Sequence, residues 1–410
     1  MALSDSVPIT GRADPVSQRT ANLAALLRAL RSGPLSRTQL AARCGVNKAT
    51  VSSLVTELSG RGLVRPAGML TGVSGRPSQL VELRGESAYG LALGIEADRF
   101  SALATDLAGR VVAERTAAAD VVTLGLHRGM DELAELAHDL LAGMEAPPAG
   151  VTVSVPGLVD SAGALLRFAP TLRWRDAEIA DLLAARLGLP LAAIAVDNEA
   201  NLGALAEAHA RPGVSDLFYL SGGIGIGGGL VCGGLLQRGA RGFAGEVGHV
   251  TVDPQGEHCP CGRLGCLETK AGLPAVLRAA APAEDRLHDP ALGVDGRARL
   301  LRERVRQNDQ RAVAAVHELG VALGVALSTV VDVLDPDVIV LGGYLAELGD
   351  WLIEPVRLEL GARTLANHAR CRVEASSLGT TAGLRGAAHQ AIERLFTDPT
   401  LSPLTEEAQA

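Results

Sequence analysis

Aromatic residues are scarce in this chain of 410 residues: five Phe, three Tyr and two Trp make up only 2% of it. Apolar residues nevertheless account for 47%, which is enough to form large buried cores. Those cores must therefore be built from Leu, Val, Ile and Ala. The chain is also too long for one ordinary domain, so we expect two or three units.

Long apolar runs are absent as well. The first thirty residues lack the continuous apolar core of a secretory signal. The longest stretch without charge, Leu217–Gln237, contains eight glycines, which disfavour a stable membrane helix. We therefore expect a soluble, cytoplasmic protein with no membrane partner.

An excess of positive charge is missing from the chain as a whole, whose net charge is -8. That average argues weakly against a nucleic-acid-binding protein, but it hides an asymmetry. Residues 1–84 carry eleven Lys or Arg against four Asp or Glu, a net of +7, and the remainder carries -15. A basic head on an acidic body indicates polyanion binding confined to the head, although a solvated basic surface would show the same charge.

Cysteine is rare, yet three of the six cysteines lie together at Cys259, Cys261 and Cys266, with His249 upstream. In a cytosolic chain such a cluster favours a metal over disulfides. One His and three thiolates supply the tetrahedral set that zinc prefers, so we predict a structural Zn²⁺ in the loop 249–266. Two alternatives are that His258 replaces His249 as the fourth ligand, and that the three cysteines stay reduced without a metal.

The head has the pattern of a helix-turn-helix with a wing. Leucines spaced three and four residues apart predict a first helix, which Gly33-Pro34 ends. Ser36 and Gln39 form a capping-box pattern for a second helix, and Gly45 suits a tight turn. Asn47 is a good N-cap for a third helix. The buried residues of the first and third helices would be Leu23, Leu26, Leu27, Leu30, Val51, Leu54, Val55 and Leu58.

The opposite face of the third helix carries short polar side chains and one cation, which fit a major groove. Strand-like residues from Leu63-Val64 and from Gln79 to Leu83 flank a glycine-rich return, which predicts a two-stranded wing. Arg76 in that return is suited to a minor groove. The alternative is a small helical docking domain with no role on DNA. The predicted DNA contacts are Arg37, Asn47, Lys48, Thr50, Ser52, Ser53 and Arg76, with Thr56 on the same face.

A short polar linker follows Arg84-Gly85-Glu86, and beyond it strand-like and helix-like segments alternate, which indicates an α/β architecture. Expected strands are Leu91–Ile95, Val112–Ala113 and Val151–Val155, and Met130–Ala142 is an expected helix. A further strand, Leu217–Leu220, runs into the glycine-rich segment 222–229. That segment suits a tight β-hairpin, or alternatively a turn that approaches a phosphate through backbone N–H groups.

Two carboxylates flank the cysteine loop: Glu246 lies three residues before His249, and Glu268 lies two after Cys266. A metal that closes this loop would bring both acids to one place. Paired acids and an amide such as Asn198 can hold the hydroxyl pattern of a sugar. Taken singly, each acid would be an ordinary surface residue.

Six short motifs lie along the body: Gly245-Glu-Val-Gly-His249, Cys259-Pro-Cys-Gly-Arg-Leu-Gly-Cys-Leu-Glu268, Ser154-Val-Pro-Gly157, Ala169-Pro170, Asp197-Asn-Glu-Ala-Asn201 and Val340-Leu-Gly-Gly343. With them, nearly the whole chain resembles the ROK family of repressors and sugar kinases, and the head fits its repressors of the xylose or N-acetylglucosamine type. The resemblance implies an actin-like fold of two lobes with a sugar between them, and a homodimer or homotetramer on operator DNA. It implies sugar contacts at Asn198, Glu246, His249 and Glu268, with Glu199 beside them, and zinc on His249, Cys259, Cys261 and Cys266.

The chain departs from the kinases of that family at three places. Glu199 stands where they carry an Asp as general base, and the extra methylene would displace the base. Their first phosphate loop reads Asp-x-Gly-Gly-Thr, whereas residues 96–100 here read Glu-Ala-Asp-Arg-Phe, and Ile224 occupies the Thr position of the second loop. Together these changes argue against ATP-dependent catalysis. Thr171 and Arg173 also replace an Asn and a Gly near the sugar.

We therefore predict a winged helix-turn-helix over residues 1–84 and a sugar-binding ROK domain over residues 89–396. The predicted protein is not an enzyme but a sugar-responsive repressor of carbohydrate metabolism genes, released from its operator by a sugar. The alternatives are an ATP-dependent sugar kinase with an accessory DNA-binding head, and a protein-interaction module. Xylose, glucose and N-acetylglucosamine all remain open as the effector.

Overall fold

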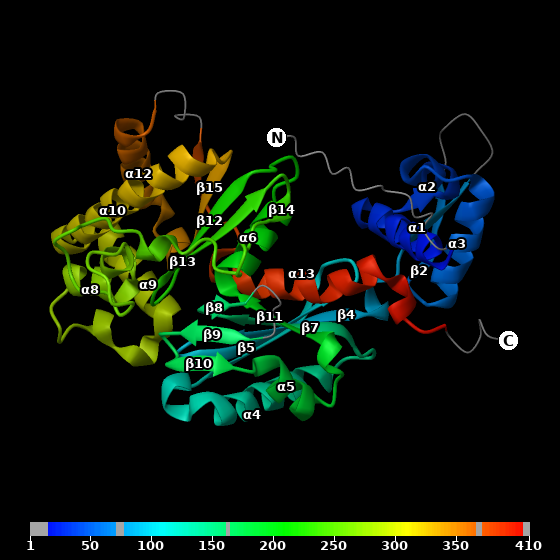
Figure 1. Ribbon diagram of the computed structural model, residues 1–410, viewed down its shortest axis with the longest axis horizontal. Helices are drawn as coiled ribbons and strands as arrows, with labels where there is room; N and C mark the ends of the chain where they lie inside the picture. Colours follow the sequence, from blue (N-terminus) through cyan, green and yellow to red (C-terminus); the bar gives the residue numbers. More distant parts are fainter. Residues whose placement is uncertain (1–14, 71–77, 161–164, 366–370, 405–410) are drawn as a thin grey trace, which may run out of the picture.

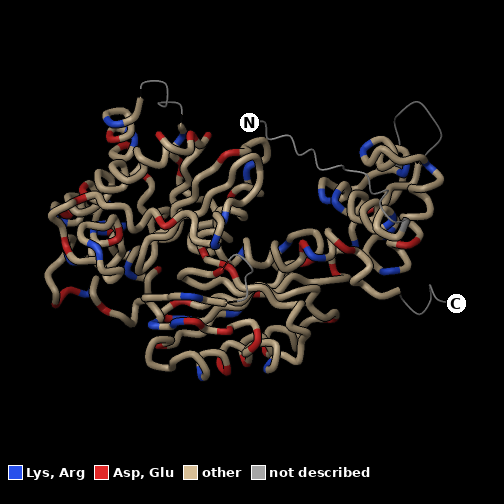
Figure 2. The backbone as a smooth tube through the Cα atoms, in the orientation of Figure 1, with Lys and Arg blue, Asp and Glu red and all other residues tan. Residues whose placement is uncertain are grey.

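The computed structural model describes residues 15–70, 78–160, 165–365 and 371–404, and shows a small head joined to a larger two-lobed body (Figure 1). The fold is the predicted one, a winged helix-turn-helix followed by an α/β body. Basic side chains gather on the head (Figure 2), as the charge asymmetry predicts.

The head contains three helices and a three-stranded sheet of order β1-β3-β2. The four leucines of the first helical stripe and the four apolar residues of the third helix are all buried, as predicted. Arg76 falls outside the described residues, so the tip of the predicted wing is not placed. The elements are α1 (Pro15–Ala29), β1 (Leu35–Ser36), α2 (Arg37–Cys44), α3 (Lys48–Gly60), β2 (Val64–Leu70) and β3 (Ser78–Leu83).

Local signals in the head sequence place its turns. Ser36 and Gln39 form the reciprocal capping box at the start of α2, with Ser36 N donating to Gln39 Oε1 at 2.8 Å. Gly45 ends α2 with a φ of 69°, a region that favours glycine. Asn47 caps α3 by accepting from the backbone N–H of Thr50 at 2.8 Å. The capping predictions are therefore confirmed.

The segment that joins head to body, Gly85–Ser87, packs against the first lobe. Gly85–Ser87 forms a 3-10 turn, and the carbonyl of Gly85 accepts from Leu107 N at 3.0 Å. Gly85 is buried. It packs so closely against Asp106 that a Cβ at this position would lie 2.8 Å from a carboxylate oxygen of that residue. Backbone packing thus fixes the connection to the body, and the charge composition of the sequence does not reveal this packing.

The first lobe is built on a mixed sheet of order β11-β7-β4-β5-β6. Helices α4 (Val121–Leu141) and α5 (Ile179–Leu187) pack on one face and α13 (Ala382–Thr397) packs on the other (Figure 1). The three predicted strands and the predicted helix are present, and a further strand, β5, lies between two of them. The strands are β4 (Tyr89–Ile95), β5 (Arg99–Asp106), β6 (Val111–Ala118), β7 (Pro148–Val155) and β11 (Ile194–Asn198), with a small separate sheet of β8 (Leu158–Val159), β9 (Leu166–Ala169) and β10 (Trp174–Ala177).

The second lobe contains a sheet of order β14-β13-β12-β15-β16. The glycine-rich segment forms the β12–β13 hairpin, with Gly222 opposite Ile226, so the hairpin prediction is confirmed. The strands are β12 (Leu217–Gly222), β13 (Ile226–Cys232), β14 (Leu235–Leu236), β15 (Val338–Gly343) and β16 (Arg372–Ala375), and the helices are α7 (Glu268–Ala271), α8 (Leu273–Ala280), α9 (Gly293–Arg306), α10 (Gln310–Leu334), α11 (Tyr344–Glu347) and α12 (Gly349–Arg363).

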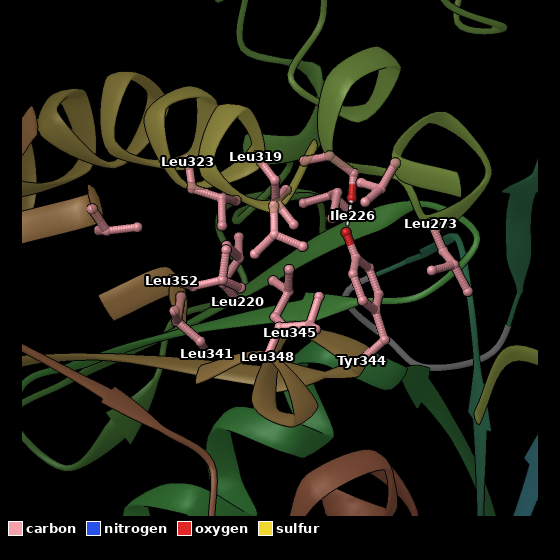
Figure 3. Packing of buried hydrophobic residues seen from close by; sticks show 14 of the residues in the cluster. Leu220, Ile226, Leu273, Leu319, Leu323, Leu341, Tyr344, Leu345, Leu348 and Leu352 are labelled. Atoms are coloured by element: carbon pink, nitrogen blue, oxygen red, sulfur yellow. Dashed lines mark hydrogen bonds between the residues drawn. The ribbon is translucent and has the colours of Figure 1, made fainter. Parts of the chain in front are cut away.

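The core of this lobe is aliphatic, as the scarcity of aromatic residues requires. Leucines from β12, β15 and α10 pack together beside Tyr344, whose hydroxyl donates to the carbonyl of Ala271 (Figure 3). Among the described residues, α10 is the one helix long and apolar enough to cross a membrane by length and composition, and half of that stretch is buried. Since α10 packs against α8, α9 and α12, it has the setting of a core helix.

Helix α6 (Glu199–His209) lies beside α13, and the two helices separate the sheets of the two lobes. α6 packs on β12 and β13 of the second lobe, while α13 packs on β4, β5 and β7 of the first. The contact between the lobes is therefore largely a contact between two helices. This arrangement places the carboxyl end of β11 and the start of α6 between the two lobes.

Candidate functional site: a cavity between the lobes and a metal-ligand cluster

A cavity of about 540 Å³ lies between the lobes, and all five predicted sugar-binding residues line it. Asn198 and Glu199 come from the junction of β11 and α6. Glu246 and His249 come from a 3-10 turn at 247–249, and Glu268 begins α7. The structure thus brings together residues that are up to 70 positions apart in the chain. Such a concave site with a few convergent polar groups is the usual form of a small-molecule site.

The side chain of Asn198 is held in one orientation. Its Oδ1 caps α6 by accepting from Ala200 N at 2.8 Å and from Asn201 N at 3.2 Å. Its Nδ2 donates to the carbonyl of Gly157 at 2.8 Å. An amide nitrogen carries two donors, so one N–H of Asn198 remains to serve a ligand in the cavity.

The carboxyl group of Glu199 is already hydrogen-bonded to another side chain of the protein. The hydroxyl of Ser221, on β12, donates to its Oε1. Burial raises the pKa of the Glu199 carboxyl, although the Ser221 hydrogen bond and the charge of Arg99 lower it. A carboxyl that is held by Ser221 and favours its neutral form is poorly suited to take a proton from a sugar hydroxyl.

The two acids that flank the cysteine loop face the same region of the cavity. Glu268 Oε2 accepts from the backbone N–H of Ile226 at 3.0 Å, and a Cβ on Gly225 would collide with that carboxylate. Burial, and then the charge of Glu268, raise the pKa of Glu246 to about 7. Glu246 and Glu268 therefore lie near each other in the cavity wall, as their positions around the cysteine loop predicted.

His249, Cys259, Cys261 and Cys266 form one cluster, and one ligand atom from each lies within 4.8 Å of the others. Cys261 Sγ is 3.7 Å from Cys266 Sγ, and Cys259 Sγ is 3.6 Å from His249 Nδ1. A tetrahedron with metal–sulfur bonds of about 2.3 Å has edges of about 3.75 Å, so these separations fit a four-coordinate ion. The four side chains can hold a metal ion, and His258, the alternative fourth ligand, is outside the cluster.

Two features position the metal-ligand cluster beside the cavity: a glycine that lets the cysteine loop close, and the orientation of His249. Gly265 has a φ of 66°, and a Cβ there would overlap the carbonyl of Asp253, so the loop can close only with glycine at this position. His249 turns Nδ1 to the cysteines, while its Nε2 lies 4.0 Å from Glu246 Oε2. One imidazole thus touches both the metal ligands and the cavity.

The turn at 96–99 bridges the two lobes. Arg99 donates to both carboxylate oxygens of Glu96, at 2.9 and 2.6 Å, and to Asp295 Oδ2 of α9 at 2.7 Å. Asp98 Oδ2 accepts from Val294 N at 2.9 Å. Burial raises the pKa of Glu96 to about 7, against the lowering effect of Arg99. Residues 96–100 align with the first phosphate loop of the ROK kinases. In this chain that turn carries carboxylates and makes hydrogen bonds from one lobe to the other.

Other residues of the cavity wall were not predicted from the sequence. Phe168 and Phe243 supply apolar wall, Arg263 reaches the cavity from the cysteine loop, and Glu114 reaches it from β6. Of the two departures noted near the sugar, Thr171 lines the cavity and Arg173 adopts a positive φ of 58°. Only the position of Arg263 inside the cysteine motif offered a signal that could have been used.

Of the predicted DNA-contacting residues, Asn47, Lys48, Thr50, Ser52 and Ser53 lie in α3 or at its N-cap, Arg37 begins α2, and Arg76 lies outside the described residues. Lys48, Ser52 and Ser53 are exposed. Ser52 Oγ donates to the carbonyl of Lys48, and Ser53 Oγ accepts from Arg19 of α1. Thr50 at the start of α3 and Arg37, which begins α2, are partly exposed. Asn47 already uses its oxygen as the N-cap, which leaves its amide nitrogen for another contact.

Comparison with known proteins finds a matching family for each part of the chain. The sequence profile of the ROK family matches residues 89–394, and that of the MarR family matches residues 20–68. A protein of Caldicellulosiruptor sp. (strain Rt8B.4), proposed to be a xylose repressor, is 32% identical over 382 residues, which cover 89% of this chain and 93% of that protein.

Two solved structures share the fold. A ROK family transcriptional regulator, a homologue of the Escherichia coli MLC protein, superposes with a TM-score of 0.75 at 21% identity, covering 94% of this chain and 99% of that one. A ROK family glucokinase from Streptomyces griseus, in complex with glucose and AMPPNP, superposes with a TM-score of 0.65 at 28% identity, covering 75% of this chain and 100% of that one. The ROK profile matches most of the chain, which therefore belongs to the ROK family and carries a MarR-type head in front of its ROK domain.

Proposed function

We propose that this protein is a sugar-responsive repressor of carbohydrate metabolism genes. In this proposal a winged helix-turn-helix within residues 1–84 binds operator DNA, and a sugar bound within residues 89–396 lowers that affinity. The observation that carries the proposal is the cavity in which Asn198, Glu246, His249 and Glu268 converge, in the same chain as a MarR-type head. Similarity to a protein proposed to be a xylose repressor supports it, and glucose and N-acetylglucosamine remain candidates beside xylose.

The DNA contacts in this proposal come from α3, Arg37 and the wing. Lys48 would neutralise a phosphate, while Thr50, Ser52 and Ser53 are short enough to approach base edges. Asn47 would contribute its amide N–H groups, and Arg76 would reach a minor groove. A homodimer or homotetramer in the cytoplasm would present two heads to a two-fold operator.

The metal in this proposal is a structural Zn²⁺ on His249, Cys259, Cys261 and Cys266. Three thiolates and one imidazole are a closed, soft set typical of structural zinc. Bound there, zinc would hold the loop shut and leave no open position for chemistry. His249, directed by the loop, would then present Nε2 toward Glu246 and the sugar.

We further propose that the chain is not an enzyme. Glu199 is bound by Ser221, and the turn at 96–99 presents carboxylates to the space where kinase phosphates would lie. A nucleoside triphosphate would meet the carboxylate of Asp98 and would have to break the contact of Arg99 with Asp295. A sugar kinase remains the second candidate because kinases of the family share the fold. Assay of ADP release with pentoses and hexoses should show no turnover, and clear turnover would overturn this assignment.

The function itself is tested in two steps. Purified protein is screened by thermal shift against xylose, glucose, N-acetylglucosamine and related sugars, and we expect at least one to raise the melting temperature. Footprinting on the DNA upstream of the protein's own gene should then show protection that the same sugar removes. Protection that no stabilising sugar changes would contradict the effector model, and the absence of any protection there would favour a protein-interaction module.

A further inference from the structure

Helix α13 runs from the cavity to the head (Figure 1). At its start, Thr381, Gly383 and Leu384 line the cavity. Gly383 lies against Glu199, since a Cβ there would be 3.1 Å from the Glu199 carbonyl oxygen. The first turn of α13 therefore touches the same residue that begins α6.

Along its length α13 is packed too closely to slide independently of the first lobe. A Cβ on Gly90 of β4 would overlap the carbonyl of Ala388, and one on Gly150 of β7 would lie 2.8 Å from the carbonyl of Ala391. On the other side, a Cβ on Gly386 would overlap the carbonyl of Leu202 in α6. α13 is thus a rigid rod on the first lobe, with α6 against its outer face.

The far end of α13 is bound to the head by charge. Glu393 pairs with Arg31 at 2.5 Å and with Arg28 at 3.8 Å. Arg31 also places its guanidinium 3.5 Å from the centre of the Phe396 ring. The same guanidinium therefore contacts two residues of α13, which fixes the angle at which α1 meets that helix.

The apolar core of the head extends onto α13. Ile392, Leu395 and Phe396 are at most 3% exposed and belong to one cluster with the leucines of α1 and the apolar face of α3. Just beyond α13, the carbonyl of Ser402 accepts from Arg61 at 2.6 Å, and the Ser402 hydroxyl donates to the Arg61 carbonyl at 3.0 Å. Arg61 is the C-cap of α3, so the chain after α13 is connected directly to the predicted recognition helix.

We propose that α13 transmits occupancy of the cavity to α3, and that Glu393 is the positioning residue that keeps the head aligned with this rod. The inference rests on the proposed function. A ligand that moves the lobes must turn α6 about its close contact with α13 at Gly386, because these two helices lie between the two sheets. The head moves with α13 as one body, since both its apolar core and the docked connection at Gly85 are fixed to the first lobe.

The test uses full-length protein carrying Glu393→Ala or the isosteric Glu393→Gln. Sugar affinity is measured by calorimetry, and operator affinity by fluorescence anisotropy with and without saturating sugar. Wild-type protein should lose operator affinity about tenfold or more on sugar binding. Both variants should bind sugar with the wild-type constant within about twofold, while the sugar effect on operator affinity falls below about threefold. Glu303→Ala, an exposed acid on α9, is the matched control and should respond like wild type.

The outcomes separate the two proposals. If wild-type protein responds to sugar and both Glu393 variants respond equally, α13 does not carry the signal and the repressor function stands. If wild-type protein binds sugar without any change in operator affinity, both proposals fail. Hydrogen exchange gives a second readout: sugar should change protection where α6 meets α13 beyond the cavity, at residues 202–209 and 386–392, but not in α12, and a change confined to the cavity would overturn the proposal.

Discussion

Cys259, Cys261 and Cys266 differ from the other three cysteines in lying beside a histidine that also faces the cavity. We predict about one zinc per chain in wild-type protein, and loss of most of it in Cys261→Ser, because three remaining ligands hold the ion far more weakly. The variant should melt several degrees lower and respond less to sugar. Elemental analysis and thermal unfolding measure both effects. Cys232→Ser, outside the cluster, is the control, and full zinc content in Cys261→Ser would disprove the ligand assignment.

Glu96 makes stability depend on pH. Its folded pKa is about 7, raised by burial above the ordinary 4.5. The folded state therefore holds a proton that the unfolded state has released, so this group stabilises the fold fully below pH 4.5, and the contribution is lost as pH rises through 7. Because 35% of the side chain is exposed, the expected loss is only about 1 kcal/mol.

Chemical denaturation of wild type and Glu96→Gln at pH 5 and pH 8 checks this. The stability of wild type relative to the variant should fall by about 1 kcal/mol between the two pH values. Glu303→Gln, an exposed acid, should show no such relative change. A relative stability of wild type over Glu96→Gln that stays constant with pH would contradict the raised pKa.

At the scale of residues, the sequence predicted groups that share a short motif and missed those that meet only in space. The four residues of the metal-ligand cluster lie within 18 positions, so the sequence could group them, although the spacing left His258 as an alternative to His249. The Ser221 partner of Glu199 and the Asp295 partner of Arg99 are far away in the chain, and no local pattern marks them. The roles of Asn198, Glu199, Glu246, His249 and Glu268 toward a sugar stay predictions, as do those of the α3 residues toward DNA.

At the scale of elements, helix α13 depends on glycine where it meets α6. Gly386→Ala should lower the free energy of unfolding by roughly 3 kcal/mol, because the new methyl group overlaps the Leu202 carbonyl. Gly361→Ala is the matched control: nothing lies within 4 Å of its Cβ, and it sits on the exposed face of α12. That variant should gain about 0.5 to 1 kcal/mol. Equal effects in urea denaturation would contradict the close packing of α6 on α13.

Helix α3 should contribute one phosphate contact through Lys48. Lys48→Ala is expected to weaken operator and nonspecific DNA alike and to reduce the slope of log affinity against log salt by about 1. Anisotropy titrations at several salt concentrations measure that slope. Arg306→Ala, an exposed cation on α9, should leave it unchanged. An unchanged slope in Lys48→Ala would remove Lys48 from the DNA interface.

Elements with a clear period or cap were predictable, whereas several buried strands, β5 among them, were not. The helices of the head follow from the leucine spacing, the capping box and Gly45. Strand β5, Arg99–Asp106, escaped because nearly all its residues are buried, so no alternation of polar and apolar residues marks it. Its buried polar residues, such as Ser101 and Asp106, also interrupt any apolar run.

At the scale of the whole molecule, the fold class and the order of the two parts could be predicted, whereas their attachment could not. The head shares its core with α13, whose sequence lies more than 300 positions away, and Arg31 meets Glu393 across that separation. Likewise, the lobes are joined by Arg99 and Asp295, which are 196 positions apart. Contacts of this kind depend on topology, which composition and local spacing do not encode.

We expect a sugar in the cavity to lower the affinity of the head for its operator. Titration of fluorescent operator DNA with the protein at fixed salt, in the absence and presence of a saturating sugar that stabilises the protein, measures this effect. The dissociation constant should rise about tenfold or more with sugar. An operator affinity that is the same with every sugar that binds the protein would contradict it.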